Sequence, residues 1–137
     1  MSPRKRRASA FTLLEVLLVL AILVIMGSTV TYYFIGAQHK ANRSQALSQM
    51  SMFGQLLTNY HLDVGSYPTT AQGLEALRIP PAELANTNRW QGPYADKDIP
   101  LDPWGNPYQY ESDGTEYRIW SWGADGQDGT EDDVYNQ

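Results

Sequence analysis

The sequence predicts an α+β fold, in which a long N-terminal helix is followed by a small antiparallel sheet. Of the eight prolines, only Pro3 precedes Pro68, so a helix can run between these two without interruption. Apolar residues recur at helical spacing through residues 47–64. Two runs rich in tyrosine and tryptophan then flank Asp113-Gly114, a pair that is typical of a hairpin turn.

Residues 1–10 form a short basic segment ahead of the helix. They carry four of the ten Lys and Arg residues, which leaves six against fifteen Asp and Glu, a formal charge of about −9, from Phe11 onward. Such an acidic remainder lacks the clustered cations of a nucleic-acid-binding surface, so nucleic acid is not an expected partner. The chain has no cysteine, so disulfides and thiolate metal sites have no part in the expected fold.

The first half of the helix is predicted to cross a membrane. Residues 16–26 are eleven consecutive apolar residues. Residues 11–35 would form a helix about 37 Å long, enough to span a bilayer, with the preceding basic residues in the cytoplasm. We therefore divide the chain into a leader (1–10), a transmembrane and assembly segment (11–35) and a head (36–137) that includes the second half of the helix.

Three interpretations of this N-terminus compete. A secretory signal peptide would place its small-x-small triplet after the apolar core, whereas Ala8-Ser9-Ala10 comes before it. A signal anchor explains every feature except Glu15, because a charge in lipid costs roughly a few kcal/mol. A short leader that is removed on the cytoplasmic face, leaving the apolar helix as the new N-terminus, is the third interpretation. Glu15 would otherwise be an interfacial carboxylate that stays hydrated near the headgroups.

The run "FTLLEVLLVLAIL" resembles the N-terminus of type IV pilins and pseudopilins, in which Phe is the first mature residue and Glu the fifth. The resemblance implies cleavage between Ala10 and Phe11 by a prepilin peptidase, followed by methylation of the Phe11 amine. It also implies that Glu15 meets the terminal amine of a neighbouring subunit during assembly. The family usually has Gly before the cleavage site, where this chain has Ala10.

A second apolar pattern lies in the same helix. Its members are spaced by 3, 3, 4, 3 and 4 residues, which places them in one stripe: Leu47, Met50, Phe53, Leu57, Tyr60 and Val64. Gly65 and Pro68 then end the helix. We expect the stripe to pack into the core of the head; a coiled-coil partner helix is the alternative.

Short elements are predicted after Pro68. Thr69 and Gln72 fit a capping box that opens a short helix through "AQGLEALR", and the proline-rich residues 80–107 are expected to form an ordered loop. The runs "PYQYES" and "EYRIWSW" predict a β-hairpin, whose second strand presents two faces. One face holds Tyr117, Ile119 and Ser121, and the other holds Arg118, Trp120 and Trp122. The large aromatic residues of "DPWGNPYQY" and "YRIWSWG" are expected in the core rather than in a sugar-binding platform.

Five carboxylates crowd residues 125–133, which suggests either a solvated acidic tail or a cation site. Three nearby glycines and the preceding strand favour a defined loop. Two carboxylates about 4–5 Å apart repel by roughly 3–4 kcal/mol at an effective dielectric near 20, so folding them together calls for a cation. Oxygen ligands alone favour Ca²⁺ over zinc or copper. The spacing is not that of an EF-hand, because Gln127 and Gly129 stand at the third and fifth positions from Asp125.

Enzymatic activity is not expected. His39 and His61 are separated by about 33 Å along one predicted helix, so they cannot form a dyad within one chain. The sequence has no nucleophile-elbow, zinc-protease or P-loop motif. Asp98 and Asp102, on either side of Pro100, are expected to be turn formers rather than an acid/base pair.

The motifs "YPTTAQGLEAL", "DPWGNPYQY" and "GADGQDGTEDDV", in this order, resemble the major pseudopilins of type II secretion systems. The resemblance implies a pilin-like fold whose C-terminal loop binds one calcium ion. The match places side-chain ligation on Asp125, Asp132 and Asp133 and backbone carbonyl ligation on Trp122. A further backbone carbonyl, at Asn136, completes the expected set.

The resemblance also implies the function. The chain would be a structural subunit of the secretion pseudopilus, a helical homopolymer that drives export of folded proteins across the outer membrane. Its expected partners are copies of itself, minor pseudopilins, the inner-membrane secretion platform and the prepilin peptidase. We expect a single-pass protein of the bacterial inner membrane with its head in the periplasm. The alternatives are a minor pseudopilin or type IV pilin, and a membrane-anchored calcium-dependent binding module.

Overall fold

The computed structural model describes residues 11–84 and 86–136, with the side chains of 29–35 left undescribed. The predicted leader, residues 1–10, therefore lies outside the described residues. By its internal contacts the chain divides into two compact units, which part between Gln38 and His39.

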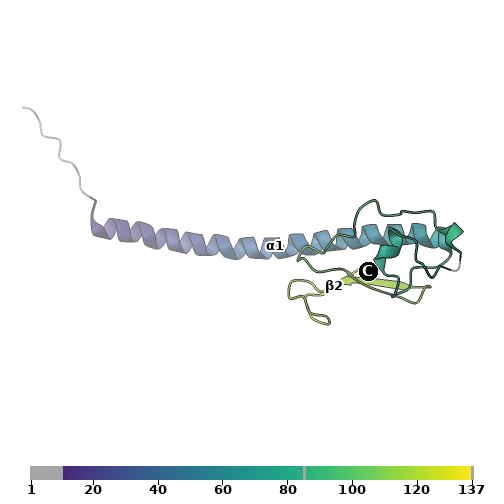
Figure 1. Ribbon diagram of the computed structural model, residues 1–137. Coiled ribbons are helices and arrows are strands. Elements are labelled where there is room, and N and C mark those ends of the chain that lie inside the picture. The colour runs from purple at the N-terminus through teal and green to yellow at the C-terminus, as the bar shows by residue number, and fades with distance from the viewer. Residues whose placement is uncertain (1–10, 85, 137) are drawn as a thin grey trace, which may run out of the picture. The chain divides into compact units, whose positions relative to one another are not determined.

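Helix α1 (Leu13–Val64) confirms the long helix that the proline distribution predicted (Figure 1). It begins with a capping interaction that the sequence analysis missed. The backbone N–H of Glu15 donates to the carbonyl oxygen of Thr12 at 3.1 Å and lies 3.3 Å from its hydroxyl, the spacing of a capping box. The apolar side chains of residues 13–20 are exposed. Within the described residues, no helix combines the length and the apolarity that crossing a membrane requires.

The second half of α1 supplies one side of the core in the C-terminal unit. The buried stripe on this helix consists of Ala46, Met50, Phe53, Leu57 and Tyr60. The prediction that Leu47 opens the stripe is wrong, since that side chain is 37 % exposed. Ala46 precedes Met50 by four residues, which continues the alternating 4 and 3 spacing of the face, whereas the larger Leu47 is turned away from it.

Two short 3₁₀ helices lie between α1 and the sheet. Only half of the predicted capping box is formed: the Thr69 N–H donates to the side-chain oxygen of Gln72 at 2.9 Å, but the Gln72 N–H donates to the Thr69 carbonyl rather than to its hydroxyl. The helix that follows is shorter than predicted: η1 spans only Leu74–Leu77 and starts after Gly73, whose φ of 61° is not helical. η2 (Thr87–Arg89) lies within the proline-rich loop. That loop is fastened to the core, since the N–H groups of Tyr94 and Ala95 both donate to the Leu77 carbonyl.

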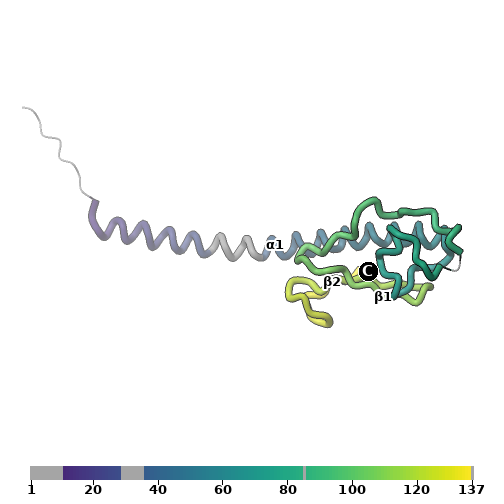
Figure 2. Tube along the Cα trace, in the orientation of Figure 1, coloured from purple at the N-terminus to yellow at the C-terminus, as the bar shows by residue number. Residues whose placement is uncertain are grey.

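Three antiparallel strands form the sheet in the order β1–β2–β3. The predicted hairpin is confirmed as β1 (Gln109–Ser112) paired with β2 (Tyr117–Ser121), which Figure 2 shows side by side. The alternation on β2 also holds, with Ile119 buried and Arg118 exposed. β3 (Val134–Tyr135) was not predicted; it pairs with the end of β2 through Ser121 and Val134.

The sheet and α1 share one hydrophobic core. Ile119 and Val134 of the sheet are buried in the same cluster as Phe53 and Leu57 of the helix. The aromatic residues of the 102–110 stretch lie in or against this cluster, as predicted: Trp104, Tyr108 and Tyr110. In the 117–123 stretch the prediction holds for Tyr117 but not for Trp120 and Trp122, which are half-buried outside the cluster. The core fixes the ends of β2 and β3, and those ends carry the acidic loop.

Candidate functional site

The acidic segment, residues 122–133, connects β2 to β3 and is therefore a loop closed by paired strands. It appears in yellow beyond the end of β2 in Figure 2. Its two ends meet at Gly123, where an added Cβ would lie 2.0 Å from the carbonyl oxygen of Asp132. Only a glycine fits so close an approach, and its φ of 68° lies in the left-handed region that glycine favours.

Asp133 is the one predicted ligand whose side chain is buried, at 4 % exposure. Its Oδ2 accepts hydrogen bonds from the Gly129 N–H at 2.9 Å and from the Tyr135 hydroxyl at 2.8 Å. The hydrogen bond to this carboxylate raises the pKa of Tyr135. The second oxygen, Oδ1, is buried without a hydrogen-bond partner. A carboxylate oxygen left in this state costs free energy, and a bound cation would remove that cost.

The other carboxylates of the loop are exposed. Asp125 accepts a hydrogen bond from the Gln127 N–H at 3.0 Å, which turns the loop back on itself. Asp128 accepts from the indole nitrogen of Trp120 at 3.0 Å, so this acid is tied to the outer face of the sheet. Asp132 borders a pocket together with Lys40 and Arg43 of α1.

The donor chemistry of the loop fits calcium, although the described residues hold no group of three His, Cys, Asp or Glu side chains close enough to bind a metal. Asp125, Asp132 and Asp133 share one loop without being gathered into such a cluster. Asn136 and Trp122 were predicted to bind the ion through their backbone carbonyls. The N–H of Asn136 donates to the Ile119 carbonyl at 3.3 Å. Trp122 is half-buried, and its carbonyl belongs to the peptide unit that ends at Gly123.

The predicted assembly residues lie at the start of α1. Phe11 is 81 % exposed, and the predicted partner in cleavage, Ala10, lies outside the described residues. Glu15 is exposed in the first turn of the helix. A carboxylate in this position is favoured by the positive end of the helix dipole. The side chain of Glu15 is therefore accessible to another molecule.

Asp98 and Asp102 have separate partners. Asp98 forms an ion pair with Arg78 at 2.6 Å. Asp102 is a turn former, as predicted: its Oδ1 accepts the backbone N–H groups of Trp104 at 3.0 Å and Asn106 at 2.8 Å. Its burial, at 4 % exposure, was not predicted.

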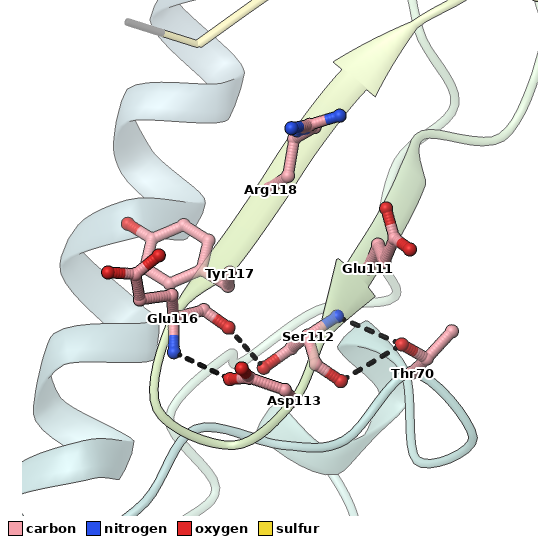
Figure 3. Close-up of a pocket in the computed structure, with 7 residues that line it drawn as sticks. All are labelled: Thr70, Glu111, Ser112, Asp113, Glu116, Tyr117 and Arg118. Carbon is pink, nitrogen blue, oxygen red and sulfur yellow. Dashed lines mark hydrogen bonds between the residues drawn. The ribbon is translucent and has the colours of Figure 1, made fainter.

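A second polar pocket lies at the turn between β1 and β2 (Figure 3). Asp113 accepts the backbone N–H groups of Glu116 at 2.9 Å and Thr115 at 2.8 Å, and these bonds lower the pKa of its carboxyl group. The Ser112 hydroxyl donates to the Glu116 carbonyl at 2.7 Å. The side chains of Asp113 and Ser112 in this pocket therefore serve to hold the β1–β2 turn.

Two family models match the chain, one over its N-terminus and one over most of the remainder. Residues 33–137 match the family model described as type II secretion system (T2SS), protein G. The chain belongs to this family. Residues 5–31 match the prokaryotic N-terminal methylation motif, a range that includes Ala10, Phe11 and Glu15. The family predicted from the sequence motifs is thereby confirmed.

Relatives in this protein G family match the chain over most of its length. The type II secretion system core protein G of Aeromonas hydrophila is 42 % identical over 135 residues, which cover 97 % of this chain and 94 % of that protein. The same protein of Vibrio cholerae is 42 % identical over 130 residues, or 93 % of this chain and 88 % of the relative.

A solved relative confirms the predicted α+β, pilin-like fold. The crystal structure of the major pseudopilin from the type 2 secretion system of enterohaemorrhagic Escherichia coli is 35 % identical, with a TM-score of 0.65. The match covers 74 % of this chain and 91 % of the crystallised one.

Proposed function

We propose that the chain is a structural subunit of the type II secretion pseudopilus, in which it polymerises with copies of itself. Growth of that filament would drive folded proteins across the outer membrane. The observation that carries the proposal is the exposed apolar start of α1, with the accessible carboxylate of Glu15 in its first turn. Its membership of the protein G family and its similarity to the solved structure of a major pseudopilin support the proposal.

Assembly would begin with removal of the leader. Cleavage between Ala10 and Phe11 by a prepilin peptidase, followed by methylation, creates a cationic amine at Phe11, and the methylation motif supports this step. Glu15 of one subunit then pairs with the Phe11 amine of the next. Two different surfaces meet in such a contact, so it is heterologous, and a rod can extend without closing into a ring.

Before assembly, the subunit would reside in the bacterial inner membrane. The eleven apolar residues 16–26 and the methylation motif support a single pass through the bilayer. The basic leader favours a cytoplasmic N-terminus and hence a periplasmic head. Minor pseudopilins and the inner-membrane platform of the secretion system are the further partners of this arrangement.

Calcium is the proposed ligand of the loop at residues 122–133. Side-chain oxygens of Asp125, Asp132 and Asp133 would hold it, with backbone carbonyls of Trp122 and Asn136. The unpartnered Oδ1 of Asp133 supports this proposal. The ion would neutralise carboxylates of the loop and hold the loop in one shape, which stabilises the surface that it presents to neighbouring subunits.

Replacing Glu15 with glutamine tests the assembly proposal. The amide keeps the size of the side chain but cannot form an ion pair, so we expect Glu15→Gln cells to contain the protein in their membranes and no pseudopili. Glu83→Gln, which changes an exposed carboxylate of the head, serves as the control and should assemble normally. Electron microscopy of sheared filaments, with immunoblotting of membrane fractions, gives the readout. Normal filaments from Glu15→Gln would reject the charge pair as the basis of assembly.

A further inference from the structure

A buried hydrogen-bond chain connects the 102–106 turn with the acidic loop. The Ser121 hydroxyl, which is fully buried, donates to Oδ2 of Asp102 at 2.5 Å. The same hydroxyl oxygen accepts the backbone N–H of Gly123 at 3.1 Å. The chain therefore runs from a buried carboxylate, through the last residue of β2, to the first turn of the loop.

The end of this chain is attached to a proposed calcium ligand. The Gly123 N–H belongs to the peptide unit that also contains the Trp122 carbonyl. Because a trans peptide is planar, its N–H and C=O point in opposite directions. Holding the N–H against Ser121 therefore directs the carbonyl oxygen of Trp122 away from Ser121. The hydrogen-bond chain sets the direction of that oxygen.

We propose that Asp102 and Ser121 are positioning residues for calcium binding by the 122–133 loop. Neither side chain needs to touch the ion: Asp102 fixes the Ser121 hydroxyl, and Ser121 fixes the peptide whose carbonyl ligates. The inference rests on the calcium site proposed above and adds residues outside its ligand set. Groups that orient the ligands of a metal commonly change its affinity by about 10- to 100-fold when they are replaced.

The hydrogen bonds explain why a carboxylate occupies position 102. Its Oδ1 accepts two backbone N–H groups, from Trp104 and Asn106, while Oδ2 accepts the Ser121 hydroxyl. All three partners are donors, and only an ionised carboxylate accepts at both oxygens. These three bonds offset the cost of burying the charge. A charged acceptor also strengthens the bonds that follow along the chain, which increases the negative charge on the Trp122 carbonyl oxygen.

The 102–106 turn also lies close to the acidic loop at Gly126. An added Cβ at Gly126 would lie 3.5 Å from the side-chain nitrogen of Asn106. Gly123 itself packs against the backbone of Asp132, so a shift of the Trp122–Gly123 peptide would displace a second proposed ligand. Loss of the Ser121 hydroxyl is therefore expected to disturb both ends of the loop.

The β1–β2 turn offers a matched control. Ser112, which is half-buried, has the same hydrogen-bond pattern as Ser121, because its hydroxyl oxygen accepts the Gly114 N–H at 3.0 Å. Its hydroxyl donates to a second acceptor, the Glu116 carbonyl, as Figure 3 shows. Ser112→Ala removes an equivalent pair of hydrogen bonds at the other end of the hairpin. Its effect measures what such a loss does to the fold alone.

The test is calorimetric titration of calcium into the full-length chain in detergent, combined with thermal unfolding in EGTA. Ser121→Ala and Asp102→Asn should each bind calcium about 10- to 100-fold more weakly than the wild type, while Ser112→Ala binds normally. Ser121→Cys keeps nearly the same volume but accepts hydrogen bonds only weakly, so it should fold and also lose affinity. If Ser121→Ala does not fold, the calcium affinity of Ser121→Cys tests the positioning role instead.

The possible failures differ. A wild-type chain that takes up no calcium overturns the proposed site, and the positioning role with it. If the wild type binds calcium, and Asp102→Asn and the folded Ser121 variant bind it with the same affinity, the positioning role alone is overturned. Lower stability in EGTA with unchanged calcium affinity would mean that the two residues serve the fold only, which also overturns the inference.

Discussion

At the residue scale, Asp133 combines a satisfied and an unsatisfied oxygen in one buried carboxylate. The satisfied oxygen, Oδ2, stabilises the folded loop by accepting hydrogen bonds from Gly129 and Tyr135. The unsatisfied oxygen has no role in that hydrogen-bond network. A cation bound to Oδ1 would replace the cost of burying an unpaired carboxylate oxygen with a favourable interaction.

Calcium removal and the Asp133→Asn variant test this account together. Calcium at one hundred times its dissociation constant should stabilise the wild type by about 2.7 kcal/mol relative to EGTA. Asp133→Asn should lose this response and, in EGTA, unfold with an unchanged or slightly higher free energy, by up to about 1 kcal/mol, because an unpaired buried charge is gone. Thermal unfolding measures both, with Asp96→Asn, an exposed acid of the proline-rich loop, as the control. A full calcium response from Asp133→Asn would contradict the role given to this oxygen.

The roles of single residues were predicted unevenly. Short motifs identified the carboxylates of the loop, because a run of acids between glycines is visible in the sequence itself. Asp102 was predicted correctly as a turn former, but its bond to Ser121 was not foreseen. That bond joins residues 19 positions apart, and it depends on where the proline-rich loop packs beside the sheet. That packing cannot be predicted from the local sequence around either residue.

At the scale of elements, the second half of α1 gave the clearest prediction and one error. Met50, Phe53, Leu57 and Tyr60 are buried as the spacing required. The error at Leu47 arose because the prediction favoured the larger of two adjacent apolar residues over Ala46. Burial follows the angular position on the helix, and a small side chain suffices where another element lies close.

Two leucines on this helix provide a direct comparison. Leu57→Ala should lower the free energy of unfolding by about 2–5 kcal/mol, because it leaves a cavity in the core. Leu47→Ala should change it by no more than about 0.5 kcal/mol, since that side chain is partly exposed. Leucine and alanine have similar helix propensities, so urea unfolding of both variants reports packing. Equal losses would show that the assigned core face of α1 is wrong.

The element that the sequence did not reveal is β3. It has two residues, and the sequence places it directly after the acids, where it was read as part of the loop. Val134 is buried at 1 % exposure and pairs with Ser121. A two-residue strand has too few positions for an alternating pattern to be recognised, and its existence depends on the neighbouring strand.

At the scale of the whole molecule, the head has a core rich in tyrosine, and this gives it a characteristic response to alkali. Burial raises the pKa of Tyr110 to about 12. Burial also raises the pKa values of Tyr60, Tyr108 and Tyr117 above the ordinary value of 10.0. The unfolded chain therefore loses these protons at a lower pH than the folded chain does.

The sign of the resulting pH dependence follows directly. The contribution of the buried tyrosines to stability should be constant below about pH 10 and should fall as the pH rises toward the folded pKa of Tyr110, about 12. Tyr110→Phe should be less stable at neutral pH, because the hydroxyl donates to the Pro68 carbonyl at 2.8 Å, but should show a shallower alkaline decline. Urea unfolding at a series of pH values measures the slope. A variant slope equal to the wild-type slope would contradict a buried, un-ionised Tyr110.

Molecule-wide features were predicted well where they depend on long patterns. The proline-free interval predicted the helix, and the order of three motifs predicted the family, which the protein G match confirmed. The division into leader, transmembrane segment and head remains a prediction, as does the calcium-ligand set. Both concern contacts with a bilayer, an ion or another subunit, and a single folded chain does not contain them.

The most direct test of the filament account is mass spectrometry of the N-terminus of pseudopili sheared from cells. Subunits should begin at Phe11 and carry one additional methyl group on the amine, because only a free N-terminus supplies the cation that Glu15 requires. Subunits that begin at Met1 in otherwise normal filaments would contradict the account, since the leader would still cover the amine on which assembly depends.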